Sequence, residues 1–213
     1  MGQVGKLQKF AEVKEFANCY EKAEELKGKW KSDVFKNDNP ITVELACGKG
    51  EYTIGLAERF PDRNFIGVDV KGNRIWKGAQ YALENKITNV AFHRLMIGNI
   101  EDYFETGEID EFWITFPDPQ HAKKRKRLTN AMFLSRYRNI SKEGAIMNLK
   151  SDSTRFYDFT KEIIAEQKLK VLQDSDDIYA WDEIPEHLAN IQTFYENMWL
   201  ADGKKIKFLR YEI

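Results

Sequence analysis

Asp118 lies between two prolines, and five consecutive basic residues, Lys123–Arg127, follow it within ten positions. The prolines restrict the backbone and end the apolar run Glu111–Phe116, so the carboxylate is expected to project at a strand end. An aspartate between prolines is also common in ordinary turns. The basic run is suited to hold phosphates, although such runs also occur as solvated loops or nuclear localisation signals. The pairing indicates a carboxylate site with a phosphate-binding neighbour.

A second group of residues follows the β-branched run Ile41–Ala46. Gly48 and Gly50 permit a tight turn and a close approach of the backbone to a ligand, and a helical pattern begins directly after them. Asp69 ends the next apolar run about 20 residues later, where an acid can accept hydrogen bonds from ribose hydroxyls. A glycine loop alone is weak evidence. Loop, acid and alternating pattern together predict a cofactor that contains a nucleoside.

The order of residues in this loop narrows the choice of cofactor. Ala46-Cys-Gly-Lys-Gly differs from the Gly-x-Gly-x-x-Gly pattern of dinucleotide sites. It resembles the acid-x-Gly-x-Gly-x-Gly motif of class I S-adenosylmethionine-dependent methyltransferases, with Ala46 in place of the first glycine. Glu44 would attract the ammonium and sulfonium groups of S-adenosylmethionine, whereas it would repel a pyrophosphate. The alternative is that Glu44 only caps the helix that follows.

The elements that must position these residues alternate along the chain. This alternation predicts an α/β fold: a doubly wound, mostly parallel seven-stranded Rossmann-like sheet with helices on both faces, whose ligands sit at the carboxyl ends of the strands. Strands are expected at 41–46, 64–70, 90–95, 111–116, 144–150, 169–174 and 205–213. Helices are expected at 51–60, 73–86, 130–141, 153–167 and 188–200. Before them, apolar residues three or four apart predict a helix over 6–27, and 32–40 reads as a linker. We therefore divide the chain into a helical segment with linker, 1–39, and a methyltransferase domain, 40–213.

The composition limits the classes of protein to which the chain could belong. Hydrophobic residues make up 42% of the 213 residues, and the net charge is −1, so positive charge is expected only as a local patch. No stretch approaches the ~20 apolar residues of a membrane span. Two cysteines and three scattered histidines predict neither disulfides nor a metal site. We expect a cytoplasmic protein without a metal.

The strand end at Asp118 also bears on the substrate. Adenine-N6 methyltransferases carry an Asn/Asp-Pro-Pro-aromatic motif at this position, which Phe-Pro-Asp-Pro does not match. The N7 atom of guanine already carries a free lone pair, so no proton has to be removed before attack. A carboxylate suits such a base, because it accepts hydrogen bonds from guanine N–H groups and favours the positive charge that grows on the purine.

Taken together, the glycine loop, Phe-Pro-Asp-Pro with its basic run, "LKSD" and "NIQTFYE" resemble bacterial tRNA (guanine-N7)-methyltransferases, which modify a guanine in the variable loop of tRNA. The resemblance covers 41–213 and implies S-adenosylmethionine as cofactor and tRNA as partner. It implies that Asp118 is the catalytic acid and also lies near the cofactor. The implied cofactor-binding residues are Glu44, Gly48, Gly50, Asp69, Met96 and Asp118. The implied substrate-binding residues are Lys123, Asp152, Thr193, Tyr195 and Glu196.

Some positions depart from the family pattern, and some alternatives remain open. The acid usual after the third strand is replaced by Leu95-Met96-Ile97, so contact there would come from the backbone or from apolar packing around the adenine. Gln120 stands in place of a tryptophan, and Ala122 is the other candidate for the substrate-contacting position given to Lys123. A small-molecule methyltransferase and a non-catalytic RNA-binding module remain alternative functions. The chain could be a monomer or a homodimer.

Overall fold

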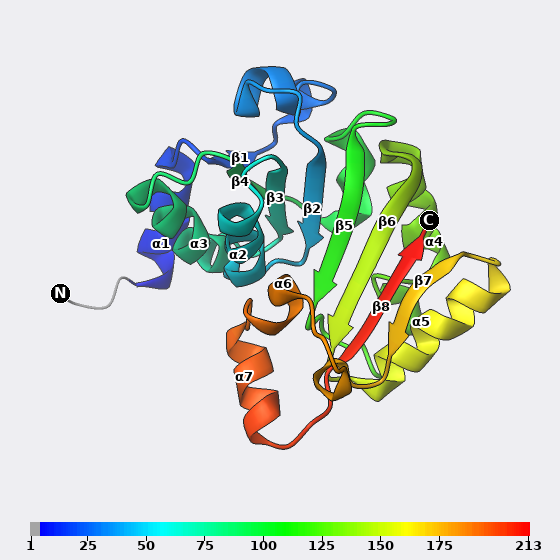
Figure 1. Ribbon diagram of the computed structural model, residues 1–213. Helices are drawn as coiled ribbons and strands as arrows, with labels where there is room; N and C mark the ends of the chain where they lie inside the picture. The colour runs from blue at the N-terminus through cyan, green and yellow to red at the C-terminus, as the bar shows by residue number, and fades with distance from the viewer. Residues whose placement is uncertain (1–4) are drawn as a thin grey trace. The chain divides into compact units, whose positions relative to one another are not determined.

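The computed structural model of the protein describes residues 5–213 (Figure 1). The chain forms two compact units, one ending at Phe104 and the other beginning at Glu105. Within the described residues there are eight strands, one more than the seven that the sequence predicts. The seven predicted strands are all present, and the additional one lies in the amino-terminal segment.

The first unit contains four parallel strands, with hydrophobic side chains and nearly complete burial in the three predicted ones. Burial on both faces is typical of parallel strands covered by crossover helices. In spatial order the strands are β1 (Cys19–Glu21), β4 (Val90–Arg94), β3 (Asn64–Asp69) and β2 (Ile41–Leu45). The crossover helices are α2 (Glu51–Arg59) and α3 (Gly72–Glu84).

Adjacent residues of β4 show how both faces of the first unit are covered. The Phe92 ring lies beneath α2 and α3, where it would collide with a side chain at Gly50 or Gly78. The next side chain, His93, points to the other face and contacts the rings of Trp30 and Tyr103. Because successive side chains of a strand alternate between faces, the strand is buried on both sides.

The amino-terminal prediction is wrong after the first turns of the helix. α1 spans Lys6–Glu12 and continues as a short 3₁₀ turn, Val13–Glu15, but Cys19–Glu21 form β1 and pair with the edge of β4. Pairing with an edge strand outweighs the helical spacing of the apolar residues, because tertiary contacts override local propensity. The predicted linker is also partly helical: Trp30–Phe35 form a π-helical turn that buries both aromatic ends.

The second unit contains one parallel and two antiparallel strand pairs. β5 and β6 run parallel, whereas β8 is antiparallel to both of its neighbours. In spatial order the strands are β5 (Ile109–Thr115), β6 (Ser141–Ser151), β8 (Lys207–Glu212) and β7 (Val171–Ser175). The helices are α4 (Ala131–Ile140), α5 (Thr154–Glu166), α6 (Glu186–Ala189) and α7 (Phe194–Ala201).

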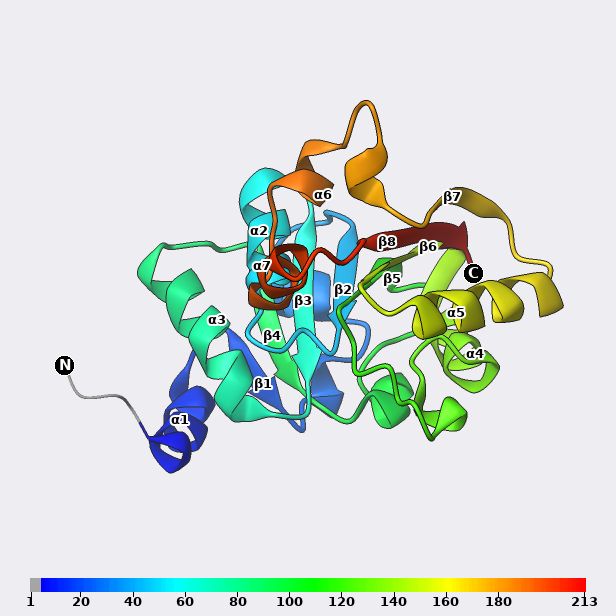
Figure 2. The same cartoon turned by 90° about the horizontal axis from the view of Figure 1, so that it is seen from below.

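Helical segments cover both faces of these strands as well (Figure 2). Phe112 packs against Tyr137 of α4, and its neighbour Trp113 packs against His187 of α6. The single helix predicted over 188–200 is divided into α6 and α7. The helix is interrupted because the buried ammonium of Lys150, on β6, donates to the carbonyl oxygens of Leu188 and Ile191, which an unbroken helix would use internally.

No helix among residues 5–213 is long and apolar enough to span a bilayer.

Candidate functional site

The loop Ala46–Gly50 turns sharply between β2 and α2. Ala46, Gly48 and Gly50 all have positive φ, at 60°, 60° and 72°. This region is unstrained for glycine but costs an L-residue about 1–2 kcal/mol. Ala46, which replaces a glycine of the resembled motif, therefore holds a strained conformation. Tertiary contacts must enforce the shape of this loop.

Close packing requires glycine at Gly50 and Gly78 of the first unit, whereas Gly48 has room beside it. A Cβ atom at Gly50 would lie 2.5 Å from the Phe92 ring. One at Gly78 of α3 would lie 2.5 Å from the carbonyl oxygen of Lys49. A Cβ atom at Gly48 would meet no atom of residues 5–213 within 4 Å. The backbone at Gly48 is therefore approachable by a ligand, as the sequence predicts.

Glu44 lies at the end of β2 with only 2% of its surface exposed. Its Oε2 atom accepts hydrogen bonds from the backbone N–H of Thr53, at 2.8 Å, and from the Thr53 hydroxyl. The alternative role that the sequence left open, a cap for the following helix, is thus present. This cap ties β2 to α2, and it also fixes a negative charge directly beneath the loop.

Asp69 lies at the end of β3 and links three parts of the same corner. Its two carboxylate oxygens accept the N–H groups of Gly48, at 3.0 Å, and Lys71, at 2.8 Å. Its carbonyl oxygen accepts the N–H of Leu95, at 3.2 Å, so the residue after β4 is drawn to the same place. The side chains of Val70 and Met96 beside it are 50% and 64% exposed. An acid and exposed apolar side chains therefore lie together next to the glycine loop.

This corner fits S-adenosylmethionine on the chemistry of its donors. The approachable backbone at Gly48 can receive the methionine end, and Glu44 and Asp69 carry the charge that attracts a cation. The exposed thioether of Met96 offers the apolar contact that an adenine ring requires. Burial, and then the negative charges of Glu44 and Asp69, hold the pKa of the Cys47 thiol well above its usual range. That thiol is therefore neutral.

Asp118 follows β5 in a tightly constrained loop of the second unit. The side chain is exposed, and its Oδ1 atom accepts the N–H of Gln120 at 2.9 Å. Phe116 and Gln120, on either side of the Pro-Asp-Pro turn, both have φ of 46°. Non-glycine residues in this region cost of order 1–3 kcal/mol and cluster at ligand-binding turns. The carboxylate thus projects from a strained turn, as the prolines predict.

The basic run that follows is divided in its roles. Lys123, Lys124, Arg125 and Lys126 are exposed, so they can meet phosphates. The expectation that the whole run holds phosphates is wrong for Arg127, which is 2% exposed. Its Nε atom donates to the carbonyl oxygen of Pro119 at 3.1 Å, and its guanidinium stacks over the Phe159 ring at 4.5 Å. Arg127 therefore braces the turn that carries Asp118.

A buried ion pair lies deeper in the second unit. The Nζ atom of Lys150, on β6, lies 2.7 Å from Oε1 of Glu196, on α7, and both side chains are 0% exposed. The Tyr179 hydroxyl donates to the same Oε1 atom at 2.9 Å. The other oxygen, Oε2, is buried and has no hydrogen-bond partner among residues 5–213. Such an oxygen is costly unless a ligand supplies a donor.

The sequence reasoning identified Glu196 but missed Lys150 and Tyr179. A lysine at the end of a buried strand is itself a signal, because lysine is almost never fully buried unless it is paired. Burial raises the pKa of Glu196, while Lys150 beside it opposes that rise. Burial also lowers the pKa of Lys150. Each group therefore favours the charged form of the other, against the effect of burial.

Thr193 and Glu196 have the spacing of a capping box, Thr-x-x-Glu. Thr193 performs its half: its hydroxyl accepts the N–H of Glu196 at 3.1 Å. Glu196 does not complete the box, because its carboxylate turns to Lys150 and Tyr179 instead. A residue that forgoes its local capping hydrogen bond and instead buries its charge is typical of a functional position.

Two other predicted substrate residues come from different elements: Tyr195 is on α7, and Asp152 follows β6. Tyr195 is 46% exposed, and its ring contacts that of Phe194. Asp152 follows β6 and pairs with Lys204 at 3.5 Å. The ends of β5 and β6 are adjacent, because the N–H of Phe116 donates to the carbonyl oxygen of Lys150 at 2.8 Å. Asp118 and Asp152 thus follow neighbouring strands of one unit.

Residues 5–213 contain no group of three or more His, Cys, Asp or Glu side chains placed to hold a metal ion.

Comparison with known proteins shows the family to which the chain belongs. A family model described as "Putative methyltransferase" matches residues 38–209. The tRNA (guanine-N(7)-)-methyltransferase of Christiangramia forsetii is 47% identical, over 100% of both chains. That of Porphyromonas gingivalis is 45% identical over 87% of this chain and 76% of its own. Among solved structures, the 16S rRNA methyltransferase KamB superposes with a TM-score of 0.63 at 13% identity, covering 100% of this chain and 95% of its own. At that identity the likeness shows the fold alone.

Proposed function

The chain belongs to the methyltransferase family that includes the bacterial tRNA (guanine-N(7)-)-methyltransferases, and on this premise we propose that it methylates N7 of a guanine in the variable loop of tRNA. The methyl donor is S-adenosylmethionine, and the reaction takes place in the cytoplasm, where tRNA matures. The observation that carries the proposal is the exposed carboxylate of Asp118 on a strained turn, followed directly by four exposed cations.

In this proposal the first unit holds the cofactor. When bound, S-adenosylmethionine supplies a methyl group made electrophilic by its positively charged sulfur. Gly48 allows the backbone to approach the methionine end, while Glu44 and Asp69 contribute the negative field that selects a cationic ligand. Gly50 keeps the loop closed over Phe92. Met96 offers apolar surface for the adenine.

In the second unit, Asp118 holds the base. Guanine N7 needs no general base, since its lone pair is already free. The Asp118 carboxylate accepts N–H groups of the purine and favours the positive charge that N7 methylation creates there. Its bond to Gln120 and the brace from Arg127 limit its motion, so little entropy is lost when the base is aligned.

The remaining residues position the ligand around that carboxylate. Glu196 presents its unpartnered Oε2 atom as an acceptor for an N–H group, with Lys150 holding the other oxygen. Thr193, Tyr195 and Asp152 supply further contacts to the substrate. Lys123 and the exposed lysines and arginine after it hold backbone phosphates, which positions the RNA without reading its sequence.

A methylation assay on an unmodified tRNA transcript tests the proposal. Asp118→Asn keeps an oxygen for the Gln120 N–H but removes the charge, so we expect kcat/KM to fall by about 10²–10³. Asp202→Asn is the matched control, because Asp202 is exposed and its side chain makes no ion pair among the described residues. The product is checked by the aniline-induced chain cleavage that N7-methylated guanosine undergoes after borohydride reduction.

Two results would overturn the assignment. If Asp118→Asn methylates tRNA as well as Asp202→Asn does, Asp118 has no catalytic role. If methyl transfer to a small acceptor persists and tRNA binding does not weaken between ~50 and ~200 mM salt, the substrate is not a nucleic acid, because phosphate contacts make affinity fall steeply over that range.

A further inference from the structure

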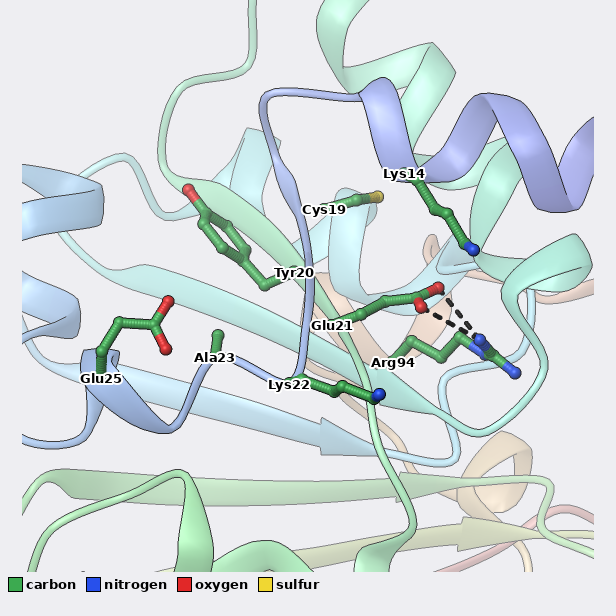
Figure 3. Close-up of a pocket in the computed structure, with 8 residues that line it drawn as sticks. All are labelled: Lys14, Cys19, Tyr20, Glu21, Lys22, Ala23, Glu25 and Arg94. Carbon is green, nitrogen blue, oxygen red and sulfur yellow. Dashed lines mark hydrogen bonds and ion pairs between the residues drawn. The ribbon is translucent and has the colours of Figure 1, made fainter.

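A hollow of about 630 Å³ lies in the first unit, where the amino-terminal segment meets the carboxyl end of β4 (Figure 3). Its charged walls come from the end of the first helical segment, from β1 and the turn after it, and from β4. They comprise Lys14, Glu21, Lys22, Glu25 and Arg94. The volume is within the usual range for ligand sites, about 300–1,000 Å³.

Arg94 is the fixed cation of this hollow. Its Nη1 atom lies 3.1 Å from both carboxylate oxygens of Glu21, its neighbour in the β1–β4 pairing. Its Nε atom donates to the carbonyl oxygen of Val70 at 3.1 Å, and its guanidinium lies over the Phe10 ring at 5.1 Å. Three elements therefore hold one side chain in place. Its Nη2 group makes no hydrogen bond within residues 5–213, so two N–H donors remain for a ligand.

Lys14 and Lys22 are the unpaired cations. Figure 3 shows both side chains extending into the region of the Glu21–Arg94 pair, from opposite walls. Both residues are exposed, and neither forms an ion pair or side-chain hydrogen bond in the part of the chain that the structure describes. Glu21 is already neutralised by Arg94. The three cations thus exceed the two carboxylates of the hollow, and the excess charge is on its two exposed lysines.

The hollow lies beside the cofactor corner of the same unit. Arg94 is the register partner of Asp69 in the β3–β4 pairing, and the next residue, Leu95, donates its N–H to the Asp69 carbonyl. The backbone of Lys22 has a φ of 51°, so a sharp turn directs this lysine at the end of β1. The carboxyl ends of parallel strands are where ligands collect in such folds.

We propose that this hollow is a phosphate-binding site for the tRNA backbone, in which Arg94 is the preorganised ligand and Lys14 and Lys22 close on the anion. The inference rests on the proposed function, since it assigns a second contact surface to the same RNA. The exposed cations Lys123–Lys126 are in the other unit, and a protein of net charge −1 needs such local patches to hold a polyanion.

The test is tRNA affinity as a function of salt for two charge-matched double variants. Lys14→Gln/Lys22→Gln removes the unpaired cations but leaves Arg94 and its contacts intact. Lys36→Gln/Lys86→Gln is the control. Both lysines are exposed and precede β2 and β4, so they lie at the amino ends of the strands, whereas the hollow lies at the carboxyl end of β4. Like Lys22, both have a positive φ, of 56°. The two variants therefore change the net charge equally, and three of the four lysines have a left-handed backbone.

We expect the hollow variant to reduce the slope of log K against log salt by about 1 to 2, because each lost phosphate contact accounts for ~0.7–0.9. KM for tRNA should rise while kcat at saturating tRNA and KM for S-adenosylmethionine stay at the wild-type values. Equal slopes for the two double variants would overturn the inference. If wild-type protein methylates tRNA and the slopes are equal, only this site is refuted; if wild-type protein neither binds nor methylates tRNA, the proposed function fails with it.

Discussion

The Lys150–Glu196 pair makes the sharpest prediction about how this site is held together. Lys150→Met keeps the length of the side chain but leaves the Glu196 carboxylate buried without its cation. Removing one partner of a fully buried pair costs about 3–5 kcal/mol. The Leu188 carbonyl, 2.7 Å from Nζ, also loses its donor, which adds about 1 kcal/mol. We expect the free energy of unfolding to fall by about 4–6 kcal/mol at pH 7.

The loss should depend on pH with a defined sign. Without Lys150, burial holds the pKa of Glu196 above its unfolded value, so the folded protein binds the additional proton. Stability then falls as pH rises from the unfolded pKa of a glutamate to the raised folded one. The difference between Lys150→Met and wild type should therefore be largest at neutral pH and shrink toward pH 4.

Urea unfolding, followed by tryptophan fluorescence and far-UV circular dichroism, measures both effects. Lys150→Met/Glu196→Gln removes both charges and should recover about 2–3 kcal/mol relative to the sum of the single variants. Lys170→Met is the control, because Lys170 and Glu212 form an exposed pair whose loss costs about 1 kcal/mol or less. Single variants whose costs add to within about 0.5 kcal/mol of the double variant would refute the coupling.

Two further predictions concern the first unit. His93 is buried, and burial lowers its pKa to about 4, so between pH 6.5 and 4 the unfolded chain binds a proton that the folded chain does not. The free energy of unfolding should therefore fall by up to about 3 kcal/mol as the pH decreases over that range. Urea titrations at several pH values should show that His93→Phe abolishes this part of the pH dependence. Gly78→Ala places a methyl group 2.5 Å from the Lys49 carbonyl oxygen, so it should lower the free energy of unfolding by about 1–3 kcal/mol. It should also weaken S-adenosylmethionine binding, measured by calorimetry. Gly98→Ala is the control: its methyl group meets no atom of residues 5–213 within 4 Å, so stability should be unchanged.

The predicted part of the fold depended on patterns that tertiary contacts reinforce. Most of the strands from Ile41 onward carry apolar or β-branched runs, and all seven predicted strands are confirmed. The amino-terminal helix was predicted too long because its spacing of apolar residues is equally compatible with burial against an edge strand. Val13 and Ala23 are buried, but only the pairing of Cys19–Glu21 with β4 decides the backbone between them. The spacing of apolar residues along the sequence does not predict that strand pairing.

The site shows a similar division between what residue types reveal and what packing decides. Spacing along consecutive strands predicts Glu44, Gly48 and Asp69. Asp69 accepts a hydrogen bond from Gly48 of the loop, and Glu44 accepts hydrogen bonds from Thr53 of the helix that follows it. Lys150 was missed because its partner Glu196 lies 46 residues away in sequence and on a helix that the sequence predicted as unbroken. An ion pair between distant elements leaves no local pattern.

The basic run after Asp118 shows why charge counting alone misassigns residues. All five side chains carry the same charge, yet Arg127 is withdrawn into the unit, where Phe159 and the Pro119 carbonyl hold it. The turn it braces contains two non-glycine residues in left-handed conformations, each costing of order 1–3 kcal/mol. A turn with that strain would relax unless its neighbours opposed it. Arg127 therefore acts on the position of Asp118, whereas the four basic residues before it are exposed.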